Sequence, residues 1–380
     1  MKSSISVHPA PRTEAGLTLV ELMVATTISL IVMLVMASLL FTTSRTNSEL
    51  ARTNSQIENG RFAIQLLASD IALAGFWANH IPTYDDLALN TVPGDVPQDV
   101  PAPCLAFDPA TWTAGHKNNL IGIPLQVYED VPAGCEDVIT DKRPDTDILL
   151  VRHAQTCVPG EANCEADVAG ALYFQPSACD SEIKDGQRFV LDTADFTLTR
   201  RDCTTPAPKR KFVSSIYYIR DYAVTEGDGI PTLMRSQFDL ASGALAHQLP
   251  VPLIEGIEGF KVELGIDNLS DSGAAVDFTQ AVDWADETTK DSPTNRGDGI
   301  LDQFLRCPGA GSCSAAQLTN AVAARVHLLV RSTDASPGYT DGKTYQLAGT
   351  DFGPYNDGFL RRVFSTTVRL VNLSGRRETP

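Results

Sequence analysis

The hydrophobic residues of the chain are concentrated in one long stretch near its start. Residues 17–41 contain no proline, no glycine and one charged residue, Glu21. A helix rises about 1.5 Å per residue and needs roughly 20 residues to cross the hydrocarbon core of a bilayer. The stretch therefore predicts a membrane-spanning helix. A carboxylate at the bilayer centre costs about 2.5 to 3.5 kcal/mol on an insertion scale, so Glu21 is predicted to have a function.

A helical pattern continues after the membrane stretch, over residues 42–78. Apolar residues recur there at spacings of seven, seven, three, four and three, which is one stripe of a helix: Leu50, Ile57, Ile64, Leu67, Ile71 and Ala74. Phe62, Leu66 and Leu73 are expected to widen the stripe. Gly60 costs roughly 1 kcal/mol relative to alanine and is expected to mark a bend or soft point. The pattern predicts an amphipathic helix whose later half packs on a sheet.

The rest of the chain changes to loops and strands. Residues 79–145 hold many prolines and little periodicity, which predicts an irregular region. Short runs bounded by turn residues predict strands in a β-rich head over 146–380: 147–153, 171–174, 188–191, 196–200, 213–224, 233–240, 253–266, 324–332 and 362–373. The expected fold class is α+β, with one long N-terminal helix packed on a β-rich head.

A polar leader, residues 1–16, precedes the apolar stretch and ends in Gly16. Lys2 and Arg12 are its only bases, so the positive-inside rule keeps the leader in the cytoplasm and sends the following chain outward. A secretory signal places its cleavage site after its apolar core. Here the small residue comes before the apolar run. This reversed order distinguishes the segment from an ordinary secretory signal.

The run Gly16, Leu17, Thr18, Leu19, Val20, Glu21 resembles the class III signal of type IV pilins and of type II secretion pseudopilins. The resemblance implies cleavage after Gly16 by a prepilin peptidase and N-methylation of the new terminus, Leu17, where the family usually has phenylalanine. It also implies that Glu21, the fifth mature residue, and Thr18 serve assembly. A plain uncleaved anchor is the alternative.

Elementary electrostatics agrees with this role for Glu21. If Leu17 is the new terminus, Glu21 lies one turn into the helix, where the helix dipole favours a negative charge. In a filament of packed helices, Glu21 could pair with the α-amine of a neighbouring Leu17. Two desolvated opposite charges would then satisfy each other and fix the register of the helices.

Three later segments, 253–267, 325–332 and 361–373, resemble the C-terminal part of PilW-type minor pilins. This resemblance implies a pilin of low abundance that primes or caps a pilus near its tip, anchored once in the bacterial inner membrane with a periplasmic head. Its implied partners are the prepilin peptidase, other minor pilins, the major pilin, a tip adhesin and the inner-membrane assembly platform. Two alternatives stay open: a J-type minor pseudopilin of type II secretion, and a membrane-tethered binding protein or enzyme with a pilin-like leader.

The composition narrows the partners and the compartment. A net charge of −17 argues against nucleic acid and anionic lipid as partners of the head. Eight cysteines all follow the membrane stretch, which suggests disulfides in an oxidising compartment. Proximity favours Cys157 with Cys164 and Cys307 with Cys313, which leaves Cys104 with Cys135 and Cys179 with Cys203 as the remaining local choice. There is no C-x2-C pair, so zinc is not expected.

The search for catalytic and metal sites predicts no enzyme and no cofactor. The chain has no G-x-S-x-G motif, and its six histidines are scattered; His327 alternates with strand residues and is interpreted as structural. Asp298 and Asp302 stand in a D-G-x-x-D spacing, a calcium candidate, but Thr294 and Arg296 would be poor ligands, and a solvated turn is preferred. The tripeptide formed by residues 296–298 is interpreted as a chance match to an adhesion motif.

Overall fold

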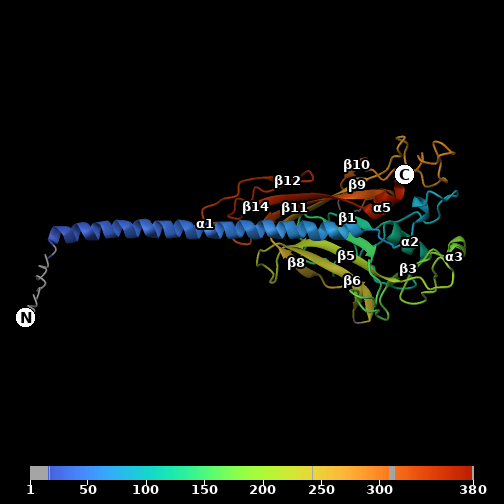
Figure 1. The fold of residues 1–380 in the computed structure, drawn as a ribbon, viewed down its shortest axis with the longest axis horizontal. Coiled ribbons are helices and arrows are strands. Elements are labelled where there is room, and N and C mark those ends of the chain that lie inside the picture. Colours follow the sequence, from blue (N-terminus) through green and yellow to red (C-terminus); the bar gives the residue numbers. More distant parts are fainter. Residues whose placement is uncertain (1–15, 17, 242, 308–312, 379–380) are drawn as a thin grey trace, which may run out of the picture. The chain divides into compact units, whose positions relative to one another are not determined.

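The computed structural model describes residues 16, 18–241, 243–307 and 313–378. Its longest element is helix α1, Leu19–Leu73 (Figure 1). The contacts within the chain divide it into two compact units, which we call the stem, Met1–Arg52, and the head, Thr53–Pro380. Residues 19–52 of α1 therefore belong to the stem, and residues 53–73 belong to the head.

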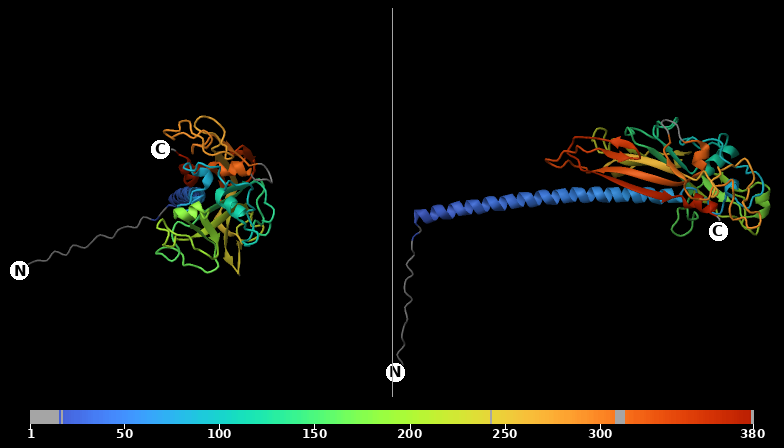
Figure 2. Two further views of the ribbon diagram at one scale, coloured as in Figure 1. Left: turned by 90° about the vertical axis from the view of Figure 1, so that its right-hand side faces the viewer. Right: turned by 90° about the horizontal axis from the view of Figure 1, so that it is seen from above.

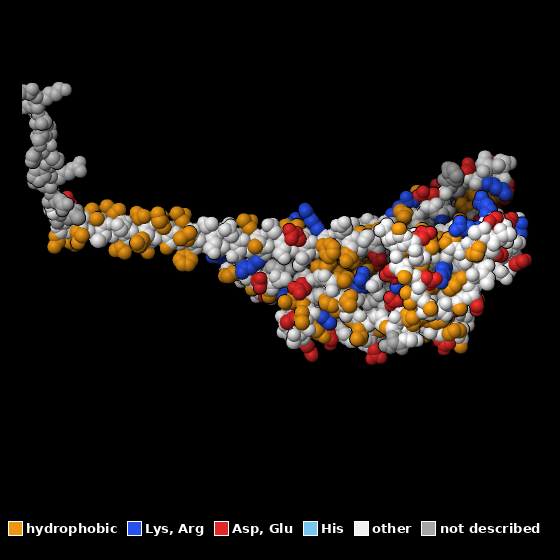
Figure 3. All heavy atoms as spheres, turned by 60° about the horizontal axis from the view of Figure 1, so that its bottom comes forward, with side chains coloured by type: hydrophobic (Ala, Val, Ile, Leu, Met, Phe, Trp, Pro, Cys, Tyr) orange, Lys and Arg blue, Asp and Glu red, His pale blue; other side chains and the backbone are white. Residues whose placement is uncertain are grey.

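The stem is a helix with an apolar surface. Its side chains from Leu19 to Phe41 are almost all exposed, and those two residues are 75% and 78% exposed. Figure 3 shows this part as a nearly continuous apolar band. Among the described residues, α1 is the helix that is long and apolar enough to cross a membrane, and none of its most apolar window is buried.

The head contains two main antiparallel sheets and a hairpin. The larger sheet has the order β1-β2-β5-β3-β4, with β6 beside β5, and β7 and β8 beside β6: β1 (Leu125–Tyr128), β2 (Ile148–Ala154), β3 (Tyr173–Pro176), β4 (Phe189–Asp192), β5 (Arg210–Arg220), β6 (Thr232–Ala241), β7 (Ala244–His247) and β8 (Val251–Glu255). The smaller sheet has the order β10-β9-β11-β14: β9 (Ile257–Ile266), β10 (Gln303–Leu305), β11 (Ala321–Arg331) and β14 (Arg361–Arg369). The hairpin pairs β12 (Tyr345–Leu347) with β13 (Thr350–Phe352).

The other helices of the described part are short. Two precede β1, namely η1 (Thr83–Asp85) and α2 (Ala114–Gly122); α3 (Asp180–Lys184) and α4 (Ala315–Thr319) lie between strands, and α5 (Val371–Arg377) follows β14. The left view of Figure 2 shows the later strands, orange to red, on one side of the head and the earlier strands, green to yellow, on the other. The head is α+β, as predicted.

The helix part of the head forms the centre of its core. Ala63, Leu67, Ile71 and Ala74 are fully buried in one apolar cluster with side chains of β1, β2 and β5 from the larger sheet and β9 and β11 from the smaller. Fully burying a leucine or isoleucine contributes about 1.5 to 3 kcal/mol. The prediction that the later helix packs on a sheet is therefore correct, and the helix contacts both sheets.

Several predicted boundaries are wrong. The predicted strand 253–266 is interrupted at Gly256, whose φ of +80° suits glycine, so it becomes β8 and β9. Residues 196–200 form no strand, and their pairing is limited to an isolated bridge between Thr199 and Pro206; the side chain of Gln175 bonds to both backbone groups of Leu198. The predicted strand 362–373 ends at Arg369, and α5 follows.

The predicted regions also differ from the structure. The irregular region 79–145 contains α2 and β1, and β1 pairs with β2 in the larger sheet. The contacts divide the chain into compact units at residue 52, and the predicted boundary at residue 41, where the membrane part of the helix ends, stays a prediction. Phe62 does not widen the buried stripe, because it is 58% exposed. The buried residues within α1 are Gln56, Gly60, Ala63, Leu67 and Ile71.

Candidate assembly site and helix anchors

The first turn of α1 is closed by a reciprocal pair of side chains. The backbone N–H and the hydroxyl of Thr18 both donate to Glu21 Oε2, at 2.9 and 2.8 Å, and the Glu21 N–H donates to Thr18 Oγ1 at 3.3 Å. This is a capping box, in which residues three apart satisfy N–H groups that lack partners in the helix. Glu21 Oε1 accepts no hydrogen bond from the described residues. One oxygen of the carboxylate thus holds the helix start, and the other is open.

The predicted processing site lies directly before this turn. Gly16 is exposed, and a Cβ built on it would meet no atom within 4 Å. Leu17, the predicted new terminus, lies outside the described residues. An exposed chain before the first helical turn is accessible to a protease.

Hydroxyl groups within the apolar stem donate to the helix itself. Thr26, Ser38 and Thr42 donate to carbonyls three or four residues earlier, at 2.8 to 3.0 Å. Such local bonds satisfy a hydroxyl that has no water or partner nearby. Between Leu19 and Phe41, Glu21 is the one charged residue in the sequence. Its exposed carboxylate lies at the start of the helix.

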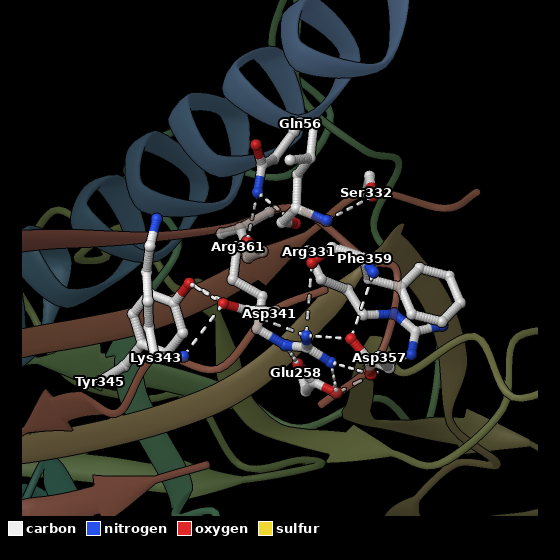
Figure 4. Close-up of polar contacts among 12 residues, drawn as sticks. Gln56, Glu258, Arg331, Ser332, Asp341, Lys343, Tyr345, Asp357, Phe359 and Arg361 are labelled. Carbon is white, nitrogen blue, oxygen red and sulfur yellow. Dashed lines mark hydrogen bonds and ion pairs between the residues drawn. The ribbon is translucent and has the colours of Figure 1, made fainter. Parts of the chain in front are cut away.

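Gln56 fixes the beginning of the head's helix part to the smaller sheet. Its buried amide Nε2 donates to the carbonyl of Val330 at 2.6 Å and to that of Leu360 at 2.8 Å (Figure 4). One turn later, Gly60 lies against the ring of Phe364, and an added Cβ would be 2.4 Å from Phe364 Cε2. Gly60 is therefore a packing residue, and its expected role as a soft point gains no support.

Asp70 fixes the end of the helix part to the larger sheet. Its carboxylate accepts a hydrogen bond from the hydroxyl of Tyr217 on β5 at 2.8 Å and lies 3.1 Å from Nε2 of His153 on β2. Burial, followed by the negative charge of Asp70, raises the pKa of Tyr217. The tyrosine therefore stays a donor to the carboxylate.

A buried charged cluster holds the loop that follows β11. The guanidinium of Arg361, fully buried, lies 2.5 Å from Glu258, 3.0 Å from Asp341 and 2.6 Å from Asp357, and stacks 3.7 Å from the centre of the Tyr355 ring. Burial alone would lower the pKa of Arg361, but its hydrogen bonds to Asp357 and Glu258 raise it. Figure 4 shows this cluster beside the segment that Gln56 contacts.

A second buried cluster holds the C-terminal helix α5. Asn372 Nδ2 donates to the carbonyls of Ala72 and Ala74 at 3.1 and 3.2 Å, where α1 ends. Arg377 lies 3.0 Å from Asp85 and 3.2 Å from Asp267. These tertiary contacts explain why residues 371–373 belong to a helix, although the sequence predicts that the strand 362–373 includes them.

Four disulfides are present, and they have the pairing that proximity along the chain favours: Cys104–Cys135, Cys157–Cys164, Cys179–Cys203 and Cys307–Cys313. Each closes a loop within the head. In the chain-entropy model a loop of about 30 residues restricts the unfolded chain by 3 to 4 kcal/mol.

The calcium candidates bind backbone groups. Asp302 Oδ2 accepts the N–H groups of Asn268 and Leu269, and Asp298 Oδ1 accepts that of Ile300. Among the described residues, no group of three acidic, histidine or cysteine side chains is placed to hold a metal ion. Arg296 is 3% exposed and donates to the carbonyls of Asp277 and Gln280, so the tripeptide 296–298 does not present its arginine to a receptor.

Three of the described histidines, His80, His247 and His327, contact other residues of the fold. His80 and His247 are buried, and burial, followed by nearby arginines, lowers the pKa of each to about 3. His247 lies between the hydroxyls of Ser214 and Ser236, at 3.2 and 3.3 Å. His327 lies 2.9 Å from both Ser365 and Glu263 across three neighbouring strands. The interpretation of His327 as structural agrees with these contacts.

The sequence analysis missed the polar residues that anchor the helix. Gln56 and Asp70 lie outside the predicted apolar stripe, and Arg361 directly precedes the predicted strand 362–373. One signal was present: Gln56, Gly60, Ala63, Leu67 and Ile71 follow one another at spacings of four, three, four and four. A glutamine and a glycine in register with a buried stripe indicate a buried amide and a close approach of another element.

Comparisons with known proteins match both ends of the chain. A family model described as the prokaryotic N-terminal methylation motif matches residues 11–37, and the model of type IV pilus-assembly protein W matches residues 216–372. Among solved structures, a type IV-like pilin from Thermus thermophilus is similar at 13% identity, with a TM-score of 0.31, over 84% of this chain and 97% of that one. A search of curated proteins found no match.

The two family matches cover the features described above. The first includes Gly16, Thr18 and Glu21 with most of the apolar helix, and the second runs from β5 to α5 through the whole smaller sheet. Pilins are structural proteins, and the N-terminal motif implies processing by a prepilin peptidase and association with other pilins. The chain is therefore a minor pilin of the type IV pilus, of the PilW type.

Proposed function

We propose that this protein primes or caps the assembly of a type IV pilus by inserting its stem helix into a bundle of other pilin helices. Before assembly it is anchored once in the bacterial inner membrane, with its head in the periplasm. The observation that carries the proposal is the stem itself: its helix exposes almost all of its apolar side chains from Leu19 to Phe41, and its first turn holds one carboxylate oxygen that accepts no hydrogen bond from the described residues.

Such a helix needs an apolar environment supplied from outside the chain. Lipid supplies it before assembly, and neighbouring pilin helices supply it afterwards, so the transfer changes little apolar exposure. Which neighbouring helices the stem pairs with then depends on the charge of Glu21. Glu21 Oε2 stays occupied by Thr18, and Oε1 can receive the α-amine of a neighbouring pilin without breaking the capping box.

The head is suited to a position at the end of the filament because it is firmly joined to its own helix part. Gln56 and Asp70 anchor that part to the smaller and the larger sheet, respectively. These anchors would hold that part in the same place in every copy of the head. The proposed partners are the other minor pilins, the major pilin, a tip adhesin and the assembly platform.

The test replaces Glu21 by alanine and by glutamine, the latter as a control for size. Without the carboxylate, the α-amine of a neighbour is left unpaired in an apolar bundle, at a cost of about 3 to 5 kcal/mol, or a factor of hundreds or more in incorporation. Processing and membrane insertion should be unchanged. The measurement is the ratio of the protein in sheared pili to that in the membrane fraction, and equal ratios for all three forms would contradict the proposal.

A further inference from the structure

A hollow of about 410 Å³ lies at the end of the head where the helix part of α1 ends. Three segments far apart in sequence build it: the loop from Thr83 to Asp95, the first turns of α2, and the turn that leads into β4. Figure 1 shows α2 close to α3, which precedes that turn, at this end of the head. Six of its lining residues bear on what it could bind: Thr83, Asp95, Lys117, Asn118, Arg188 and Phe189.

The wall of the hollow is held in place by contacts that do not involve a ligand. Lys117 Nζ lies 2.9 Å from Asp192 Oδ2 on β4, which joins α2 to the sheet. The backbone N–H of Thr83 donates to Asp95 Oδ2 at 2.8 Å, and its hydroxyl donates to Asp95 Oδ1. A preformed wall reduces the ordering cost that a ligand must overcome.

Two planar polar side chains in the wall lack close partners. The Asn118 amide makes no hydrogen bond with the described residues, and Arg188 has only an ion pair with Asp86, at 3.9 Å. Both are half-buried. An amide carries an acceptor beside two donors, and a guanidinium presents a fork of donors. Such groups suit a ligand with neighbouring hydroxyls, each of which can donate and accept.

An aromatic ring supplies the apolar side of the hollow. Phe189 stacks on Phe174, with ring centres 5.5 Å apart, and meets the edge of His80 at 5.0 Å. These contacts fix the ring while it stays half-buried. A fixed aromatic face beside polar groups fits a ligand with an apolar C–H face and a polar rim, which is the character of a sugar ring.

The charges in the wall favour a neutral ligand. Lys117 faces Asp192 and Arg188 faces Asp86, while Asp95 adds a third carboxylate. The cations therefore give no net positive potential that would attract an anion.

A second hollow of about 400 Å³ adjoins the first and shares Gly94 and Asn118 with it. Its lining includes His116, whose Nε2 is buried and makes no hydrogen bond in the described part of the chain. The two hollows together give room for more than one ring.

We propose that the paired hollows form a binding site for a neutral saccharide of at least two units. One ring lies on Phe189, with its hydroxyls bonded to Asn118 and Arg188, and the next unit extends toward His116. The site is separate from the stem, so it does not depend on the role proposed for Glu21.

Ligand-observed saturation-transfer NMR tests the site on the processed, full-length protein in a zwitterionic detergent without sugar groups. The neutral probes are N,N′-diacetylchitobiose, an amino-sugar disaccharide, and lactose, a galactose-ended one; glucuronate is the anionic probe. Saturable binding of either neutral probe is expected, and the probe that binds identifies the source of the saccharide. Absence of binding by both, or binding of glucuronate alone, would overturn the proposal.

Two variants locate the binding in the hollow. Asn118→Ala removes a hydrogen-bonding group that has no structural partner, and it should weaken binding about three- to tenfold. Phe189→Leu keeps an apolar side chain but removes the ring, and it should weaken binding by a similar factor. Asn90→Ala, an exposed asparagine outside both hollows, is the matched control and should bind like the unchanged protein. Binding that neither Asn118→Ala nor Phe189→Leu weakens would overturn the assignment.

Discussion

Two parts of one helix, α1, differ in whether their apolar side chains are exposed or buried. In the stem, residues 19–41 expose nearly all of theirs, and the helix keeps its polar groups satisfied by local bonds. In the head, the stripe from Gly60 to Ala74 is buried between two sheets, and polar residues of the helix bond to distant segments. The stem is therefore suited to partners from outside the chain, whereas the helix part of the head is fixed within the head itself.

Polar residues mark this difference more clearly than apolar ones do. Within the described part of the chain, the side chain of Glu21 bonds to Thr18, three residues away, whereas that of Gln56 bonds to carbonyls more than 270 residues away in sequence. A local bond leaves the helix free to exchange neighbours. A bond to a distant strand is kept only while the fold is intact. The predictions below alter one part of the comparison at a time.

The largest effect is expected from Gly16→Leu. The residue before the cleavage point must fit a protease site built for glycine, so the variant should accumulate almost entirely as a precursor that keeps its leader. Mass spectrometry of the membrane fraction measures the N-terminus. A mature chain that begins at Leu17 in normal yield would refute the assigned processing site.

A large effect on the head is expected from Arg361→Met. The change leaves Glu258 and Asp341 buried beside an uncharged side chain, which should lower the free energy of unfolding by about 3 to 5 kcal/mol. Arg362→Met, an exposed neighbour on β14, is the control and should change stability little. Urea unfolding of both variants, followed by tryptophan fluorescence, makes the comparison, and equal midpoints would show that the cluster adds no stability.

Acid should weaken the head through its buried histidines. The pKa values of His80 and His247 are about 3 in the folded chain, against about 6.5 when unfolded, so the unfolded state binds more protons between these values. Their stabilisation is complete above pH 6.5 and is lost as the pH falls, by about 2 kcal/mol per histidine at pH 5. Unfolding free energies between pH 7.5 and 5 test this.

The matching variant is His247→Gln, which removes one titrating group. It should reduce the loss of stability between pH 7.5 and 5 by about 2 kcal/mol, whatever its effect at neutral pH. An unchanged pH dependence in this variant would show that His247 is not a source of the acid sensitivity.

A smaller effect, notable for its sign, is expected from Gly60→Ala. Helix propensity alone would stabilise by about 1 kcal/mol, but the added methyl group meets the Phe364 ring at 2.4 Å and should destabilise by about 1 to 3 kcal/mol. Gly375→Ala in α5 is the matched control, since nothing lies within 4 Å of its Cβ position, and it should not destabilise. Thermal unfolding of the two variants measures both effects. A stabilised Gly60→Ala protein would mean that the Phe364 ring moves aside at little cost.

The sequence by itself determined the features that depend on nearest neighbours along the chain. The apolar run 17–41, the position of Glu21 one turn after Thr18, and most strand cores follow from composition and periodicity, because helical turns and strand alternation are local. Disulfide pairing also followed proximity here, since each partner is within 31 residues of the other.

Only the tertiary structure decided which polar residues are buried and where the head begins. Gln56, Asp70 and Arg361 meet partners that are distant in sequence, and a pattern of polar and apolar positions assigns such residues to the surface. The end of β14 and the start of α5 depend in the same way on bonds to the end of α1 and to Asp85. The paired hollows need three separate segments to meet. Burial of a polar group is favourable only once its partner is in place, and that condition belongs to the folded chain.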